Sequence, residues 1–311
     1  MIAVAGESLI DLMPGAGGTL VPRPGGGPFN VARGLARLEV TCAFLGAVSS
    51  DRFGTVLREA LVRDGVDVSQ VVQSGRPTTL AVAELDGAGS ARYRFYTEGT
   101  AAASLTSDAA LAALSAVAPR ALHVGTLGLA LEPVGDAIEC MVEAVSDDVL
   151  VAVDPNWRPD VLDDPSPWRR RIDRVLTRAD LIKVSSDDLA YLTPGVTMAE
   201  SARALLLGRT RCVVVTNGPS DVLLFTPEGE SRVTPPRARV VDTVGAGDAF
   251  CAGLLAWCAG HGFDRELLGA LPSMEEAARL GATVAARSTE RAGADPPRLV
   301  EVTSGEDRSS V

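Results

Sequence analysis

The chain has 311 residues, of which 46% are hydrophobic and 22% are charged, and its formal net charge is −11. This length can bury a large core, and the acidic balance argues against a surface that binds nucleic acid or an anionic membrane. The longest apolar runs are far shorter than the roughly 20 residues that cross a bilayer. The five cysteines include no Cys-x-x-Cys pair, which favours reduced thiols in a cytoplasmic protein over zinc ligands or disulfides.

Apolar strand segments alternate with helical segments along most of the chain. Strands are predicted at residues 2–5, 43–48, 121–125, 149–153, 181–184 and 212–216. Helices are predicted near 29–38, 52–63, 107–117, 133–145, 167–178, 197–207, 246–259 and 274–290. Two of these helices have the pattern of a capping box at the start, Thr197-x-x-Glu200 and Ser273-x-x-Glu276. Apolar strands separated by helices are typical of a parallel sheet covered on both faces.

One early region departs from this alternation. Residues 79–85 and 91–96 are rich in strand-forming residues, and only the turn Asp86-Gly-Ala-Gly-Ser90 separates them. This pattern predicts a β-hairpin, which could form a small antiparallel sheet with the segment around 19–23. We expect this sheet to act as a lid.

The segment Val240-Val-Asp-Thr-Val-Gly-Ala-Gly-Asp-Ala-Phe250 carries the strongest functional signal. A short β-branched stretch leads through a glycine turn into an apolar helix. The first N–H groups of that helix, at Gly245, Ala246 and Gly247, lack intrahelical partners and carry the positive end of the helix dipole, so the turn suits an anion. Asp248 could take a proton from a hydroxyl that attacks a bound phosphate, although an ordinary helix start also tolerates an acid there.

Two better-known glycine motifs are excluded. Gly245-x-Gly247-x-x-Phe250 has phenylalanine where a dinucleotide-binding turn needs a third small residue. The chain also contains no Gly-x-x-x-x-Gly-Lys-Ser/Thr sequence. A nicotinamide-dependent oxidoreductase and a Walker-type phosphate loop are therefore disfavoured.

Other polar segments follow predicted strands, and active sites of parallel sheets form at that edge. In Gly25-Gly-Gly-Pro-Phe-Asn30, the glycines let a ligand approach the main chain, and Asn30 offers a donor and an acceptor to sugar hydroxyls. Asp11 could accept hydrogen bonds from hydroxyls. Arg158 could reach a phosphate or polar substrate, or it could pair with the nearby acids.

Two further segments suit a nucleotide. Lys183-Val-Ser-Ser-Asp-Asp188 and Thr216-Asn-Gly218 each follow a predicted strand. Their side chains suit polar contacts to nucleotide phosphates and to magnesium-bound water. Either segment taken alone would also fit an ordinary turn.

Taken together, these segments closely resemble the ribokinase-like (PfkB) family of carbohydrate kinases, and its fructokinases in particular. The similarity covers almost the whole chain and includes GESLID at 6–11, GGGPFNVARGLARL at 25–38, PTTLAVAELD at 77–86, FYTEGTAA at 95–102, DPNWRP at 154–159, KVSSDDL at 183–189 and VDTVGAGDAFCAGLLA at 241–256.

The resemblance implies a three-layer α/β/α fold with a mainly parallel central sheet. It implies a single domain over 1–311, with a lid from about 12–25 and 76–100 that could serve as a homodimer contact. ATP and Mg²⁺ are the implied cofactors, and K⁺ is a further candidate. Membranes and nucleic acids are not expected partners.

The resemblance also implies a role for each matching residue. Asp248 would be the catalytic base, with the anion hole formed by Gly245, Ala246 and Gly247. The implied sugar contacts are Asp11, Gly25, Gly26 and Asn30, with Arg158 assisting. The implied nucleotide and metal contacts are Lys183, Ser185, Thr216, Gly218, Asp188 and Asp242, the last as a monovalent-cation site.

Some positions depart from the family pattern. Ser185-x-x-Asp188 stands where the family usually has Asn-x-x-Glu, and Ala102 and Asp221 also differ from the common residues. Relatives that act on the acidic sugar 2-keto-3-deoxygluconate carry an arginine after an aromatic pair in the lid. Here Thr97-Glu98 follows that pair, so a neutral hexose fits better.

The sequence thus predicts an ATP-dependent kinase that phosphorylates a primary hydroxyl of a neutral sugar, with fructose as the first candidate. A 2-keto-3-deoxygluconate kinase, or another sugar or nucleoside kinase of the family, remains an alternative. So does a regulator that binds sugar and nucleotide without turnover.

Overall fold

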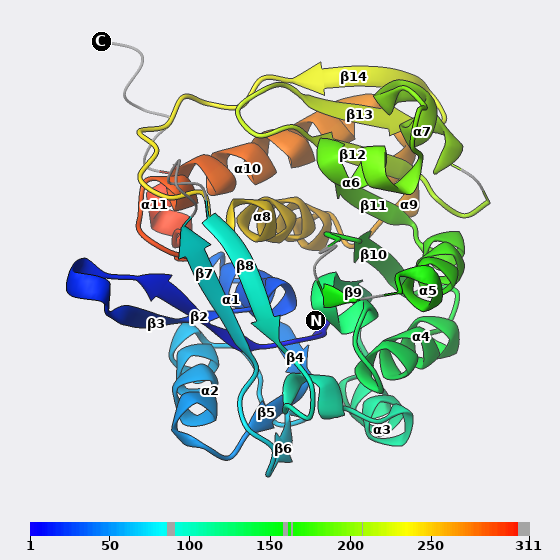
Figure 1. The fold of residues 1–311 in the computed structure, drawn as a ribbon. Coiled ribbons are helices and arrows are strands. Elements are labelled where there is room, and N and C mark those ends of the chain that lie inside the picture. Colours follow the sequence, from blue (N-terminus) through cyan, green and yellow to red (C-terminus); the bar gives the residue numbers. More distant parts are fainter. Residues whose placement is uncertain (86–90, 158–160, 163, 207, 304–311) are drawn as a thin grey trace.

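The computed structural model describes residues 1–85, 91–157, 161–162, 164–206 and 208–303. Eight strands form one large sheet in the order β14-β13-β12-β11-β10-β9-β1-β4 (Figure 1). From β4 to β12 all neighbours are parallel, and β13 and β14 extend one edge as an antiparallel hairpin. The strands are β1 (Ile2–Ala5), β4 (Cys42–Leu45), β9 (Ala121–Gly125), β10 (Leu150–Asp154), β11 (Leu181–Ser185), β12 (Cys212–Thr216), β13 (Val222–Thr226) and β14 (Gly229–Val233).

Helices cover both faces of this sheet, so its strands are buried on both sides. Alternate side chains of β1 enter different cores: Ala3 and Ala5 pack on one face, and Ile2 and Val4 on the other. The first face is covered by α3 (Ser107–Val117), α4 (Val134–Ala144), α5 (Ser166–Arg178), α6 (Ser186–Leu192) and α7 (Met198–Ala204). The second is covered by α1 (Gly27–Arg37), α2 (Arg52–Asp64), α8 (Ala246–Gly260), α9 (Arg265–Gly269), α10 (Leu271–Thr289) and α11 (Leu299–Thr303).

A second, four-stranded sheet forms the lid in the order β3-β2-β7-β8. It consists of β2 (Leu9–Pro14), β3 (Leu20–Gly25), β7 (Leu80–Leu85) and β8 (Ala91–Tyr96). Its two outer pairs are antiparallel as expected, but the central pair, β2 with β7, is parallel. These two strands come from separate parts of the chain, so no hairpin constrains their direction. The turn predicted at 86–90 lies outside the described residues. A short parallel pair, β5 (Ala47–Ser49) with β6 (Val72–Ser74), lies apart.

The predicted fold class is confirmed, with differences in detail. The strand predicted at 43–48 is interrupted at Gly46, where a Cβ atom would lie 2.5 Å from the carbonyl oxygen of Gly6. The capping box of Thr197 and Glu200 is confirmed. The one predicted at Ser273 is wrong, because α10 begins earlier, at Leu271, with Pro272 in its first turn. Within the described ranges, no helix has the combined length and apolar character of a membrane span.

Candidate active site

A cavity of about 650 Å³ lies between the lid and the carboxyl edge of the large sheet. Side chains of β2 and β8 contribute one wall, including Asp11, Tyr93 and Phe95. The opposite wall is the run from Asp242 to Asp248. The remaining lining comes from Glu7, Leu9, Met13, Gly26, Gly27, Asn30, Thr126, Leu127 and Asn156. The cavity thus brings together the predicted sugar-binding segments and the predicted anion-binding turn.

The turn before α8 has the geometry of an anion site. Gly245 caps the helix with a φ of 74°, and a Cβ there would lie 2.6 Å from that of Ala294, so only glycine fits. The N–H of Ala246 donates to the carbonyl of Thr243 at 3.2 Å and is therefore already engaged. Those of Gly245 and Gly247 have no acceptor in the described part of the chain. These two amides, at the positive end of a 15-residue helix, are the ones that can bind an anion.

Asp248 lies beside these amides and is held by Asn30. The Nδ2 atom of Asn30 donates to Oδ2 of Asp248 at 2.8 Å, and both side chains are buried. Asn30 is in the first turn of α1, so the contact joins the Gly-rich segment to the start of α8. Oδ1 of Asn30 is buried but accepts no hydrogen bond from the described residues. A buried acceptor of this kind suits a ligand hydroxyl.

The glycines before α1 allow close packing against the sugar side of the cavity. A Cβ at Gly25 would lie 2.0 Å from Oδ2 of Asp11, and a Cβ at Gly26 would lie 2.8 Å from the carbonyl oxygen of Glu7. Gly26 also has a φ of 110°, which disfavours other residues. Gly25, Gly26 and Asp11 are therefore brought together as expected.

Glu7 is a cavity-lining residue that the sequence analysis missed. Its buried carboxylate accepts hydrogen bonds from the N–H of Gly27 at 3.0 Å, from the N–H of Gly128 at 2.9 Å and from the hydroxyl of Thr126. Burial raises the pKa of Glu7, and the hydrogen bonds oppose that shift. Its position directly after the first strand was the available signal, since such positions lie at the carboxyl edge.

Asp242 joins the start of the turn to a neighbouring loop. Its Oδ1 accepts from the N–H of Val244 at 3.0 Å, and its Oδ2 accepts from the N–H of Gly293 at 2.7 Å. The same loop contacts the lid, because Nη1 of Arg23 in β3 donates to the carbonyl of Ala292 at 3.4 Å. Asp242 therefore fixes backbone on both sides of the cavity rim.

Three of the residues predicted for the nucleotide, Ser185, Thr216 and Gly218, lie near one another and do not line this cavity. Ser185 and Thr216 are register partners at the ends of β11 and β12. The hydroxyl of Ser186 donates to Oδ1 of Asn217 at 3.1 Å, which ties α6 to the turn that contains Gly218, whose φ is 53°. This region of the carboxyl edge is where the sequence analysis expects the nucleotide.

Asp188 differs from the expectation of a metal-binding carboxylate. It forms a capping box with Ser185 at the start of α6, and its Oδ1 accepts from the N–H of Trp157 at 2.8 Å. Its Oδ2 accepts from the Ser185 hydroxyl at 2.6 Å. Both oxygens thus have protein donors. Within the described residues, no cluster of three or more His, Cys, Asp or Glu side chains could hold a metal ion.

Lys183 also differs from its expected role. Its side chain is only 6% exposed, and Nζ lies 2.9 Å from Oδ2 of Asp154. Burial lowers and the charge of Asp154 raises the pKa of Lys183, with a net upward shift. Lys183 points between the sheet and α8, because alternate residues of a strand face opposite sides. This placement argues against direct contact with the nucleotide. Arg158 lies outside the described residues, and Glu98 is exposed and does not line the cavity.

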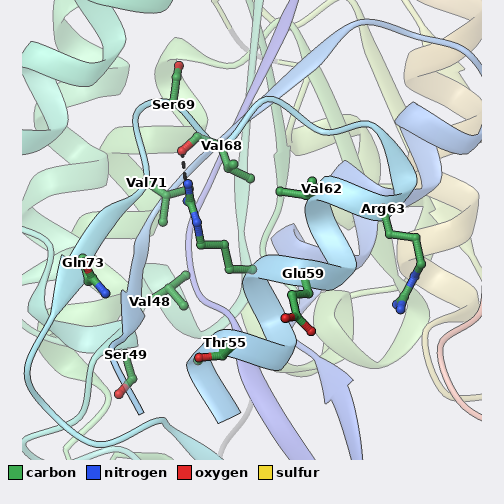
Figure 2. Close-up of a pocket in the computed structure, with 12 residues that line it drawn as sticks. Val48, Ser49, Thr55, Glu59, Val62, Arg63, Val68, Ser69, Val71 and Gln73 are labelled. Atoms are coloured by element: carbon green, nitrogen blue, oxygen red, sulfur yellow. Dashed lines mark hydrogen bonds between the residues drawn. The ribbon is translucent and has the colours of Figure 1, made fainter. Parts of the chain in front are cut away.

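A second hollow, of about 590 Å³, lies over α2 and the segment 68–73 (Figure 2). It shares no lining residue with the first cavity. Arg58 is among its lining residues and donates from Nη1 to the carbonyl of Val68 at 3.3 Å. It has neither a glycine turn at a helix start nor a carboxylate held by an amide. Of these two hollows, the first has the chemistry of a phosphoryl transfer site.

Comparison with known proteins agrees with this geometry. The family model described as pfkB family carbohydrate kinase matches residues 1–300. A fructokinase of Rhizobium leguminosarum bv. trifolii is 36% identical over 262 residues, which are 82% of this chain and 79% of that protein. A fructokinase of Klebsiella pneumoniae is 34% identical over 285 residues, which are 90% of this chain and 92% of that protein.

Solved structures extend the likeness to three dimensions. A fructokinase of Xylella fastidiosa with bound ATP superimposes with a TM-score of 0.89 at 27% identity, covering 97% of each chain. A fructokinase double mutant of Vibrio cholerae O395, with fructose, ADP and a potassium ion bound, gives 0.84 at 26% identity, again covering 97% of each chain. The chain therefore belongs to the pfkB family of carbohydrate kinases.

Proposed function

We propose that this sugar kinase uses ATP to phosphorylate a primary hydroxyl of fructose. The observation that carries the proposal is the buried pair of Asp248 and Asn30 beside the unengaged amides of Gly245 and Gly247. A base, an anion hole and a sugar acceptor thus meet at one point. Similarity to fructokinases, including structures with ATP or with fructose and ADP, supports the choice of substrates.

In the proposed reaction, the sugar hydroxyl lies between Asp248 and the terminal phosphate. Asp248 accepts the hydroxyl proton while the oxygen forms a bond to the γ-phosphorus, and the bond to the β–γ bridging oxygen breaks to release ADP. Asn30 fixes the orientation of the carboxylate through its Nδ2 donor. The amides of Gly245 and Gly247 stabilise negative charge on the transferring group.

The charge of the cavity supports a neutral sugar. Four carboxylates line it, those of Glu7, Asp11, Asp242 and Asp248, and no Lys, Arg or His side chain lines it among the described residues. An acidic sugar such as 2-keto-3-deoxygluconate would face these like charges, and the described lining residues offer it no cation. Glu98 does not contribute to this charge, because it is exposed and does not line the cavity.

Magnesium and potassium enter the proposal in different ways. The engaged oxygens of Asp188 fit an ion that arrives bound to the nucleotide phosphates and keeps much of its water, as Mg²⁺ usually does. Magnesium would neutralise phosphate charge, and Asp188 would orient the surrounding loop. A monovalent cation near Asp242 fits the position of that carboxylate against the turn.

The outer face of the lid is our candidate for a homodimer contact in the cytoplasm. Leu20 on β3 and Tyr96 on β8, the two edge strands of this sheet, are exposed by 50% and 54%. Large exposed apolar side chains at the edges of a sheet suit a protein partner. The mass of the protein in solution, measured by light scattering, would decrease to that of a monomer in Leu20→Lys if the lid forms the dimer.

The test of function is a screen for ADP release over fructose, ribose, 2-keto-3-deoxygluconate and adenosine, with and without magnesium. We expect the highest kcat/KM with fructose, and a decrease in kcat of about 10²- to 10⁴-fold in Asp248→Asn. Asp108→Asn removes the same charge from an exposed site on α3 and should behave as the wild type. Binding of sugar and ATP without ADP release would instead support a regulator. Preference for the acidic sugar would contradict the charge argument.

A further inference from the structure

We propose that Lys183 is a positioning residue of the phosphoryl transfer site, acting from behind the anion-binding turn. Its buried ammonium adds positive potential at the amide of Gly247 without touching either substrate. The inference rests on the proposed function and explains why a charged pair lies beneath the active site.

The first observation is the origin of the pair. Val153 and Ile182 are partners in the register of β10 and β11, so the next residues, Asp154 and Lys183, are also neighbours. Both side chains extend to the face that α8 covers. Cys251 of α8 donates from Sγ to Oδ2 of Asp154 at 3.4 Å, which places the pair directly under the first turns of that helix.

The second observation is the approach of the ammonium to the turn. A Cβ atom at Gly247 would lie 3.2 Å from Nζ of Lys183, and no other described atom comes within 4 Å of that point outside the local helix backbone and the adjacent residues. Of the two charges of the pair, the ammonium of Lys183 is therefore the one that lies closer to Gly247. The missing side chain of Gly247 allows this approach from the rear.

The third observation is that, among the described residues that line this gap, Lys183 is the only one that is a cation at pH 7. His123 lines the same small gap between the sheet and α8, but burial, and then the charge of Lys183, lower its pKa to about 3. His123 is thus neutral at pH 7. The other titratable groups that act on Lys183 are Asp154, Cys251 and Asp188.

Stability alone is a poor explanation for such a pair. Transfer of two charges from water to a core is costly, and well-packed apolar residues of the same size often stabilise a protein as much or more. In a site of low dielectric constant, however, a fixed cation close to the turn acts strongly on a phosphate and on the proton affinity of Asp248. The geometry accordingly points to a role in catalysis.

The test compares Lys183→Met with the double variant Asp154→Asn/Lys183→Met. The single change leaves Asp154 buried without its partner, so it combines loss of the cation with destabilisation. The double variant removes both charges, so it tests the proposal even if the single variant does not fold. We expect the double variant to retain a decrease in kcat of about 10-fold or more, with a smaller change in the KM for sugar. The acidic limb of kcat/KM should move to higher pH, because a nearby cation favours the ionised form of Asp248.

A purely structural pair gives a different result. The double variant would then recover the kcat and the acidic limb of the wild type, which would overturn the proposal. Arg265→Met is the control, since it removes a partner of the buried Asp180 at the opposite end of β11. It should lower the melting temperature and leave the acidic limb in place. An equal shift of the limb in Arg265→Met would contradict a local effect.

Failure of the proposed function is distinguishable from failure of this inference. If the wild type releases no ADP with any sugar but binds ATP, calorimetry with ATP decides: the double variant should bind it several-fold more weakly. Equal ATP affinity would overturn the role of Lys183. A wild type that neither binds ATP nor turns over would overturn both.

Discussion

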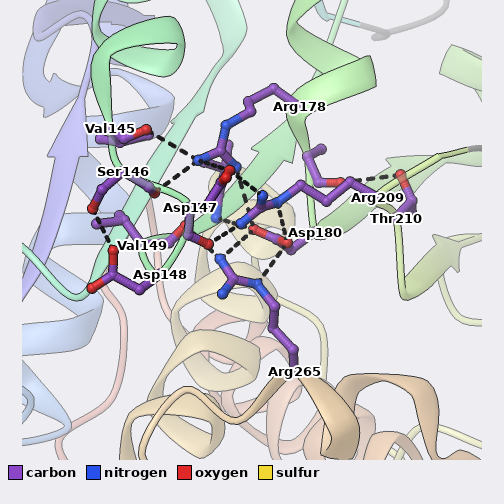
Figure 3. A network of polar contacts seen from close by, with 12 residues as sticks. Val145, Ser146, Asp147, Asp148, Val149, Arg178, Asp180, Arg209, Thr210 and Arg265 are labelled. Atoms are coloured by element: carbon purple, nitrogen blue, oxygen red, sulfur yellow. Dashed lines mark hydrogen bonds and ion pairs between the residues drawn. The ribbon is translucent and has the colours of Figure 1, made fainter.

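A buried aspartate lies at each end of the large sheet, and the two differ in their hydrogen-bond partners. At the amino end of β11, the fully buried Asp180 is surrounded by Arg178, Arg209 and Arg265 (Figure 3). Its oxygens accept from Nε of Arg209 and of Arg265, each at 2.8 Å, and from the N–H of Val151. At the carboxyl end, Asp248 is held by Asn30, whose Oδ1 has no described donor.

We infer that the network around Asp180 contributes to stability and that the network around Asp248 contributes to function. Protein donors engage both oxygens of Asp180, and these contacts join β10, β11 and α9. The network around Asp248 leaves polar groups that a substrate can complete. We expect substitutions at the amino end to change the free energy of unfolding, and those at the carboxyl end to change the rate of phosphoryl transfer.

The largest expected effect on stability is that of Asp180→Ala. Removal of the carboxylate leaves three arginines without their buried partner, which typically costs about 3–5 kcal/mol in the free energy of unfolding. Urea denaturation monitored by circular dichroism measures this loss. The kcat of the folded fraction should not change. A strong decrease in the kcat of the folded fraction would contradict the inference that Asp180 affects stability alone.

Asn30→Ala should have the reverse profile. It removes the donor that orients Asp248 and the acceptor offered to the sugar, so kcat/KM should fall by about 100-fold. Steady-state kinetics and thermal unfolding of the same preparation provide the comparison. A large decrease in melting temperature with little change in kcat/KM would show that Asn30 belongs with the structural networks instead.

The pH dependence of stability should reveal His123 beneath the site. Its pKa is about 3 in the folded state and about 6.5 in an unfolded chain. The unfolded state therefore binds the proton first, and stability decreases as the pH falls below 6.5, by up to about 1.4 kcal/mol per pH unit. Between pH 6.5 and 5, His123 should account for a loss of about 2 kcal/mol. Denaturant unfolding of His123→Gln should lack this component. If the free energy of unfolding has the same pH dependence in the wild type and in His123→Gln, the pKa of His123 is not lowered in the folded state.

The smallest expected effect concerns Asp51, which caps α2 by accepting from the N–H of Gly54 and also accepts from Thr78. Partial burial opposes the shift, but these hydrogen bonds lower the pKa of Asp51 to about 2. The carboxylate of Asp51 therefore stabilises the fold fully above about pH 4, which is near its pKa in the unfolded chain. This stabilisation is lost as the pH falls towards 2, the pKa in the folded state. We expect Asp51→Ala to cost about 1 kcal/mol, equally at pH 8 and pH 6, in urea denaturation. A difference that varies over this range would contradict the low pKa.

Local patterns predicted much of this molecule. β9, β12 and α3 have the bounds expected from the sequence, because apolar alternation and capping are properties of neighbouring residues. The parallel pairing of β2 with β7 could not be predicted, since it depends on packing between distant segments. The sequence also identified Asp248, Asn30 and Asp11 as polar residues that share one site, and the cavity brings them together.

The direction of side chains was harder to predict than their chemistry. Lys183 follows two apolar residues at the end of a strand, and only the position of α8 decides that its ammonium is buried. Asp188 was predicted as a metal ligand, but the hydrogen bond that its Oδ1 accepts from the N–H of Trp157 could not be predicted, because the two residues are 31 positions apart. Glu7 was missed because its partners, Gly27 and Gly128, are distant in sequence.

The loop at 292–293 has a mechanical consequence. It touches the lid through Arg23 and the phosphate-binding turn through Asp242, so a single short strap links the two substrate compartments. If the lid moves when a sugar binds, it would displace the loop at 292–293 and thereby change the geometry of the turn that we expect to bind the phosphates of ATP. Binding of one ligand would then change the affinity for the other, and we expect the sugar and ATP to bind with positive cooperativity rather than independently.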